Sequence, residues 1–260
     1  MSILARLFDK LVIKRFFHPM LLDQAWNNKL PGQYAFRPFA SCECCLIALM
    51  DKLTEILSYS CNKYVVLIST DISKAFDMLN HANVLHALVN CNIEDNVYNW
   101  CISYLENHSQ CTSFNNNTSP YLPINKGVIQ GSSLGPILFI VAFSDLQVHS
   151  KINTSIMYAD DIYIVIPSSN CHTLDAELLN FSSWAKEKGL SVNNDKLKIM
   201  CCCYDKGNHK LAVDGLGNIG HVTVNDMKIL GINISHNLLF SKHISQTINK
   251  CNKIFTCCIC

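Results

Sequence analysis

The chain has 260 residues, a formal net charge of +1 and 49% hydrophobic residues, which is enough for one large domain or two small ones with a sizeable core. Charged residues make up 16% of the chain, against about 25% in a typical soluble protein, so no global basic field is present to attract a polyanion. Its only arginines are Arg6, Arg15 and Arg37. A nucleic-acid partner would therefore need a local, lysine-lined cleft, and its binding should weaken with salt.

The 15 cysteines would indicate a disulfide scaffold only in a secreted chain. No signal peptide and no apolar run of membrane-spanning length is visible in the sequence. We therefore predict an intracellular chain with reduced thiols and no membrane partner. A zinc site that uses Cys257, Cys258 and Cys260 is a weaker alternative, because the paired Cys-x-x-Cys spacing is missing.

Hydrophobic spacing and turn residues predict the elements in chain order. In the first half we expect helices over residues 2–26, 41–59 and 80–104, a buried β-branched strand over 64–70, and a loop or poorly ordered hairpin over 109–126. In the second half we expect a glycine-punctuated segment over 127–135, helices over 136–146, 174–188 and 240–259, and strands over 197–203 and 227–234.

Two adjacent carboxylates, Asp160 and Asp161, lie between two apolar runs and predict a hairpin turn. A third carboxylate, Asp71, directly follows the predicted strand over 64–70. Acids at strand ends are what a two-metal phosphoryl-transfer site needs, since two divalent cations about 3.5–4 Å apart must be held by oxygen ligands, and magnesium prefers such ligands. The alternative is an ordinary solvated Asp-Asp turn.

Seven segments, in this order, resemble the reverse transcriptase domain of non-LTR (LINE-type) retrotransposons over about residues 2–234. The segments are residues 3–11, 33–38 (Gln-Tyr-Ala-Phe-Arg-Pro), 70–77 (Thr-Asp-Ile-Ser-Lys-Ala-Phe-Asp), 127–136, 158–161 (Tyr-Ala-Asp-Asp), 189–196 and 229–232. Two departures from the family pattern are Ile129, where proline is usual, and Leu197, where threonine or serine is usual.

The resemblance implies a role for each matching residue. Asp71, Asp160 and Asp161 would be catalytic and, with the backbone carbonyl of Ile72, would bind two Mg²⁺ ions, with Mn²⁺ as an alternative. The residues implied at the nucleotide or template are Arg37, Ile72, Phe76, Gln130, Gly131 and Lys196, and those implied in the primer grip are Leu230 and Gly231. Three of these roles have a structural alternative: Arg37 pairing with a helix end, Phe76 packing in the core and Lys196 as a solvated surface lysine.

The implied fold is α+β, a right-hand polymerase with an antiparallel palm sheet that has helices on one face. The domains would be partial fingers (1–62), a palm with a fingers insertion (63–235) and the start of a thumb (236–260), so that the match is truncated at both ends. The implied reaction is RNA-directed DNA synthesis from deoxynucleoside triphosphates on an RNA template with a DNA primer.

Two other hypotheses stay open at this point. A silent retrotransposon-derived fragment would at most bind RNA or a partner, and a group II intron or telomerase-related polymerase would keep the enzyme class. Protein partners are not indicated, and the chain would be nuclear if synthesis is target-primed.

Overall fold

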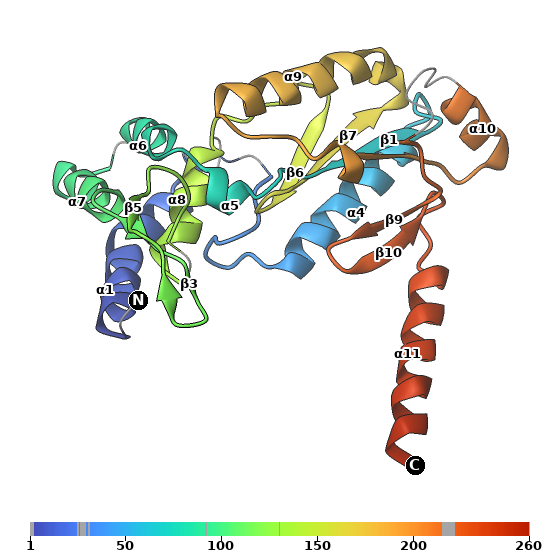
Figure 1. Cartoon of the computed structure of the whole chain (residues 1–260). Coiled ribbons are helices and arrows are strands. Elements are labelled where there is room, and N and C mark those ends of the chain that lie inside the picture. The colour runs from blue at the N-terminus through green and yellow to red at the C-terminus, as the bar shows by residue number, and fades with distance from the viewer. Residues whose placement is uncertain are drawn as a thin grey trace.

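A four-stranded antiparallel sheet in the order β6-β7-β1-β8 forms the centre of the molecule (Figure 1). The computed structural model describes residues 3–24, 26, 30, 32–91, 93–129, 131–214 and 222–259. The strands are β1 (Val65–Thr70), β6 (Thr154–Tyr158), β7 (Asp161–Pro167) and β8 (Lys198–Cys202). The antiparallel palm sheet is thus confirmed, and β1 and β8 lie within one residue of the strands predicted over 64–70 and 197–203.

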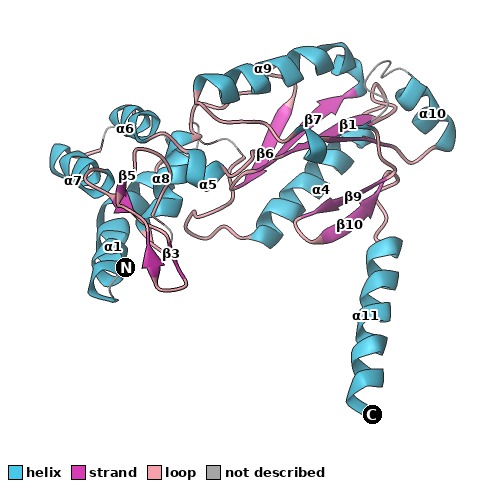
Figure 2. Ribbon diagram, in the orientation of Figure 1, coloured by secondary structure: helices cyan, strands magenta, loops and turns pink. Residues whose placement is uncertain are grey.

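Both faces of this sheet are covered, whereas helices were expected on one face only. Val65 and Leu67 of β1 pack in a core cluster with α4 (Cys42–Ser58). The alternate residues Val66 and Ile68 pack in a second cluster, which contains residues of α8 (Leu134–Ala142) and α9 (Leu174–Glu187). Figure 2 shows α4 and α9 on opposite sides of the sheet. This explains why β1 is a continuous apolar run instead of an alternating one.

Most helices of the first half of the chain, together with α8, lie as a group beside the sheet (Figure 1). They are α1 (Ile3–Val12), a π-helical segment (Ile13–Phe17), α2 (His18–Leu22), α5 (Ala75–Met78), α6 (His81–Val89), α7 (Asp95–Leu105) and α8 (Leu134–Ala142). The helix expected over 2–26 is interrupted, because Pro19 lacks the N–H that an unbroken α-helix needs.

The helix expected over 80–104 is two helices. Asn80 caps α6 by accepting a hydrogen bond from the backbone N–H of Ala82. The first helix ends at Val89, where Asn90 follows, and α7 begins only after Glu94. Asparagine competes for backbone hydrogen bonds and favours such breaks, a signal that hydrophobic spacing alone does not include.

Residues 109–123 form a nested hairpin, as one of the two expectations for this segment stated. β2 (Ser109–Gln110) pairs with β5 (Leu122–Pro123), and β3 (Ser113–Phe114) pairs with β4 (Asn117–Thr118). Asn115 and Asn116 form the two-residue turn with φ of 46° and 62°, which is the conformation that favours asparagine in tight hairpins.

In the C-terminal part, a second hairpin and two more helices follow the central sheet. The strand expected over 227–234 is a hairpin of β9 (Asp226–Ile229) and β10 (Ile232–Ser235). The helix α10 (Lys206–Asp214) was not expected, α9 (Leu174–Glu187) lies as expected, and α11 (Ser241–Ile259) projects away from the body (Figure 1). No helix among the described residues is both long and apolar enough to cross a membrane.

Candidate active site

Pairing between β1 and β7 brings two of the predicted acids to the same end of the sheet. Thr70 pairs with Ile162, so the next step along both strands places Asp71 opposite Asp161. Asp160 lies in the two-residue turn that joins β6 to β7, since Tyr158 pairs with Asp161. The fold therefore gathers Asp71, Asp160 and Asp161, from segments that are about ninety residues apart in sequence, at one end of the two inner strands of the palm sheet.

The environment of Asp160 and Asp161 disfavours their charged forms. Burial raises the pKa of Asp160, and the nearby Asp71 raises it further, while a backbone hydrogen bond and Lys196 lower it. Burial also raises the pKa of Asp161, with further contributions from Asp160 and Asp71 and an opposing one from Lys196. Three acids that repel one another at a half-buried site require a compensating cation, and oxygen ligands suit Mg²⁺ or Mn²⁺.

Lys196 is the basic group that contacts this cluster. Its Nζ donates to Oδ2 of Asp71 at 2.6 Å, and this hydrogen bond raises the pKa of Lys196. A short 3₁₀ turn, Asn194–Lys196, presents the lysine, and the backbone N–H of Asn193 donates to the carbonyl of Asp71 at 2.9 Å. The structure thus brings Lys196 to the predicted acids, and its role near the triphosphate stays a prediction.

Gln33 is a residue of this site that the sequence reasoning did not assign. It is 1% exposed, and its side-chain amide bonds to both the N–H and the carbonyl of Ala159, the residue before Asp160. The motif over 33–38 was recognised, but only Arg37 received a role from it. Its role depends on burial, which the sequence does not show. Once buried, a glutamine must satisfy both ends of its amide.

The Arg37 side chain is tied to the chain around it. Its guanidinium donates to the carbonyl of Gln33 at 3.1 Å and to that of Leu21 near the end of α2 at 3.4 Å. Burial lowers its pKa, and Tyr34 raises it. These contacts match the structural alternative for Arg37, and its predicted contact with template or nucleotide stays a prediction.

Phe76 lies partly buried between two other aromatic rings. It stacks on Phe139 with ring centroids 4.1 Å apart and meets Phe36 edge-on at 6.1 Å. The two interpretations, core packing and contact with the nucleotide sugar, are compatible with this half-buried position. Gln130 lies outside the described residues, and Gly131 has φ of 81°, a left-handed conformation that favours glycine.

A cleft of about 300 Å³ lies next to the acids. Its lining includes Asp71 and Asp161, the turn residues Leu230 and Gly231, and three lysines, namely Lys196, Lys198 and Lys228. Asp195 also lines this lysine-lined cleft, and the binding of nucleic acid there stays a prediction. Leu230 and Gly231 have φ of 46° and 90° and form the turn between β9 and β10, and their role in the primer grip stays a prediction.

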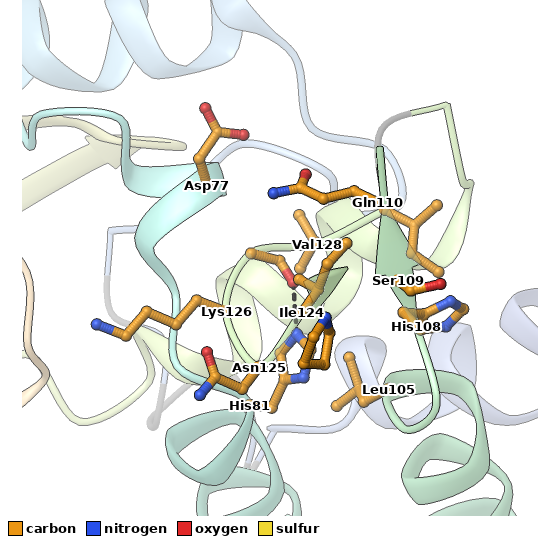
Figure 3. A pocket seen from close by; sticks show the side chains of 13 residues that line it. Asp77, His81, Leu105, His108, Ser109, Gln110, Ile124, Asn125, Lys126 and Val128 are labelled. Carbon is orange, nitrogen blue, oxygen red and sulfur yellow. Dashed lines mark hydrogen bonds between the residues drawn. The ribbon is translucent and has the colours of Figure 1, made fainter. Parts of the chain in front are cut away.

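A larger hollow of about 710 Å³ lies next to the small hairpins. In Figure 3, Asp77 and Lys126 lie on one side of it and His108, Ser109 and Gln110 on the other. His81 Nε2 lies 2.7 Å from the carbonyl of Gly127, which ties α6 to the segment that precedes Gln130. The three acids are not part of this hollow.

Asp71, Asp160 and Asp161 are the candidate metal ligands of this site. Within the described part of the chain, no group of three or more His, Cys, Asp or Glu side chains has the arrangement of a metal-binding cluster. The donor chemistry of Asp71, Asp160 and Asp161 nevertheless fits magnesium, since all three offer carboxylate oxygen. The 2.6 Å contact between Asp71 and Lys196 occupies one of these oxygens.

Comparison with known proteins gives a family match over most of the chain. The family model described as reverse transcriptase (RNA-dependent DNA polymerase) matches residues 1–234. The chain is 28% identical over 197 residues to the RNA-directed DNA polymerase from mobile element jockey of Drosophila melanogaster, covering 71% of this chain and 21% of that protein. It is 25% identical over 265 residues to the probable RNA-directed DNA polymerase from transposon BS of the same organism, covering 96% and 28%. The chain thus spans less than a third of the length of these relatives.

Solved structures with a similar fold include telomerases. Apo telomerase from Candida tropicalis, truncated from its C-terminal domain, matches with a TM-score of 0.60 at 15% identity, over 90% of this chain and 46% of that one. Telomerase from Candida albicans in complex with the TWJ fragment of telomeric RNA matches with a TM-score of 0.60 at 14% identity, over 88% and 39%. At such low identity the likeness concerns the fold, and it confirms the palm and fingers architecture.

Proposed function

This chain belongs to the reverse transcriptase family, and we propose that it copies RNA into DNA as the polymerase domain of a non-LTR retrotransposon. The observation that supports this most directly is the meeting of Asp71, Asp160 and Asp161 with Lys196 at one end of the sheet. The relatives are mobile-element polymerases, which favours the retrotransposon over the telomerase alternative.

In the proposed mechanism the protein mainly positions groups and balances charge. Asp71, Asp160 and Asp161, with the carbonyl of Ile72, would hold two Mg²⁺ or Mn²⁺ ions, which when bound activate the primer hydroxyl and stabilise the departing pyrophosphate. Lys196 would turn from Asp71 to the triphosphate, where an ammonium group offsets phosphate charge. Phe76 would lie against the sugar, and a bulky ring there discriminates by steric clash.

The lysine-lined cleft accounts for how a nearly neutral chain can bind nucleic acid. Lys198 and Lys228 line the cleft that also contains Lys196, Leu230 and Gly231. Lysine binds the phosphate backbone without reading base sequence, as a polymerase that reads its template by base pairing requires. The turn at Leu230 and Gly231 would hold the primer strand against the acids.

Primer extension tests the proposal directly. We expect the chain to extend oligo(dT) on poly(rA) in Mg²⁺ and the Asp160→Asn variant to lose all extension. A matched control is Asp145→Asn, because Asp145 bonds to Trp184 and pairs with Lys188 away from the acids. If both folded proteins fail to extend the primer, the chain is a silent fragment; if Asp160→Asn retains activity, the site assignment is wrong.

A further inference from the structure

The side chain of Gln33 holds the turn that presents Asp160. Its Oε1 accepts the backbone N–H of Ala159 at 3.0 Å, and its Nε2 donates to the carbonyl of the same residue at 3.3 Å. Oε1 also accepts the N–H of Ala35 at 3.0 Å. The two bonds to Ala159 span 126 residues of sequence, so they cannot be a local feature of the turn.

The turn needs such support because its backbone is strained. Ala159 has φ of 56°, a left-handed conformation that is unfavourable for alanine by about 1–2 kcal/mol. Asp160 and Asp161 follow it directly, and the repulsion between these partly buried acids acts on the same turn. Strain and repulsion both act against this turn, and the two hydrogen bonds from Gln33 oppose them.

The backbone around Gln33 is itself fixed against β6. The N–H of Met157 donates to the carbonyl of Gly32 at 2.7 Å, and the N–H of Tyr34 donates to the carbonyl of Met157 at 2.9 Å. These two bonds place Gln33 beside Met157 in a short parallel bridge. The amide is thus carried on a rigid segment, which positioning of a functional group requires.

We propose that Gln33 is a positioning residue that fixes the backbone at Ala159 and so aims Asp160 and Asp161 at the metal ions of the polymerase reaction. This inference rests on the proposed function. An amide suits this role because its oxygen accepts and its nitrogen donates at a fixed separation, so one side chain bonds both the N–H and the carbonyl of Ala159. Gln33 is 1% exposed and its side chain bonds Ala159 and not the acids themselves, so it acts through the turn.

Two variants separate the parts of this interaction. Gln33→Met has similar length and removes all three hydrogen bonds, whereas Gln33→Glu keeps the acceptor and loses the donor. The matched control is Asn170→Leu. Asn170 is 4% exposed, and its amide bonds to Asn153 and Ser150 beyond the opposite end of β7 from Asp161.

The first measurement is amide hydrogen exchange over residues 157–162, which does not depend on activity. We expect Gln33→Met to speed exchange at Ala159 at least about tenfold, Gln33→Glu to speed it less, and Asn170→Leu to leave it unchanged. Unchanged exchange in Gln33→Met, or an equal change in Asn170→Leu, would overturn the proposal.

The second measurement is Mn²⁺ affinity without nucleotide, followed by kinetics. Loss of a residue that orients metal ligands weakens metal binding about 10–100-fold, so we expect Gln33→Met to fall in that range and Asn170→Leu to match the wild type. In primer extension, kcat should fall with little change in KM for dTTP. If the wild type extends no primer, the proposed function fails, while exchange and Mn²⁺ binding still decide whether Gln33 positions the acids.

Discussion

The ammonium group of Lys196 lies 2.6 Å from Oδ2 of Asp71, and the lysine side chain is 64% exposed while the aspartate side chain is 10% exposed. Lys196 therefore lies at the solvent side of a buried acid. It compensates the negative charge of the cluster in the absence of other cations. A divalent ion and this lysine would compete for the same carboxylate oxygen, because each of them neutralises the charge of Asp71 from the same position.

Removal of Lys196 should separate metal binding from catalysis. We expect Lys196→Met to bind Mn²⁺ several-fold more tightly than the wild type, since no lysine then competes with the ion for the carboxylate of Asp71. Primer extension should fall in the same variant, because the triphosphate loses an ammonium group. Calorimetry or electron paramagnetic resonance of Mn²⁺ gives the affinity.

Lys198→Met is the control for this experiment, since Lys198 lines the same cleft but has no ion pair with Asp71. Its Mn²⁺ affinity should stay within about twofold of the wild type. Weaker Mn²⁺ binding by Lys196→Met would contradict the competition between lysine and metal.

The acids should make the metal-free protein less stable. Burial and mutual repulsion raise the pKa of Asp160 in the folded chain above its ordinary value of 3.8. We therefore expect Asp160→Asn to raise Tm by a few degrees at pH 7 in EDTA, where it also abolishes extension. Sites built for function often oppose stability in this way. Differential scanning calorimetry in EDTA and in Mg²⁺ measures both effects.

The sign of the pH dependence follows from linkage. A carboxyl whose folded-state pKa is raised binds its proton more tightly when folded, so its contribution to the free energy of unfolding falls as pH rises above about 3.8 through the folded-state pKa. The Tm difference between Asp160→Asn and the wild type should thus shrink as the pH is lowered through this interval. A difference that grows on acidification would contradict the raised pKa.

The position of the acids could be predicted from sequence because it depends on local patterns. Asp71 ends an apolar run and Asp160 lies between two others, so strand ends were visible without knowledge of the fold. Family motifs supplied the rest of the site in order. The likeness to telomerase structures and the match to the family confirm the fold that these motifs implied.

Features that depend on distant contacts could not be predicted. Gln33 and Ala159 are 126 residues apart, and no local pattern announces their hydrogen bonds. The covering of both sheet faces, the split at Asn90 and the hairpin at Leu230 likewise depend on packing and turn chemistry. The segment over 227–234 was predicted as one strand. Its turn was missed because leucine, which rarely has a positive φ, takes the first turn position at Leu230.

Phe76 should govern discrimination between deoxyribonucleotides and ribonucleotides. We expect Phe76→Ala to raise the relative use of ribonucleotides at least about tenfold, which corresponds to about 1.4 kcal/mol, because the ring would no longer clash with a 2′-hydroxyl. Competition between dTTP and UTP on poly(rA)–oligo(dT) measures the ratio.

The ring partner of Phe76 provides the control. Phe139 is fully buried beneath it at 4.1 Å, so Phe139→Leu disturbs the same packing without removing the ring at the sugar. Its discrimination should stay close to that of the wild type. An equal loss of discrimination in both variants would favour the core-packing role of Phe76.

Cysteine reactivity should follow burial. Burial raises the pKa of the thiols of Cys45, Cys101 and Cys201 to about 12, so almost no thiolate is present at pH 8 and alkylation should be slow. Among the described residues, Cys44, Cys61 and Cys251 are exposed free thiols and should react first with iodoacetamide. Mass spectrometry of timed samples gives the order; early labelling of Cys101 in the folded chain would contradict the packing described.

Two glycines with positive φ should respond very differently to alanine. Gly189 has φ of 69° and open space where an alanine methyl group would lie, whereas at Gly32 (φ of 77°) an added Cβ would lie 2.1 Å from the carbonyl oxygen of Ser155. Gly189→Ala should therefore lower the free energy of unfolding by about 1–2 kcal/mol from backbone strain. Gly32→Ala adds an overpacking penalty of about 1–3 kcal/mol and displaces the segment that carries Gln33. Urea unfolding compares the two, and equal losses would mean that the contact of Gly32 with β6 is looser than the 2.7 Å hydrogen bond to Met157 indicates.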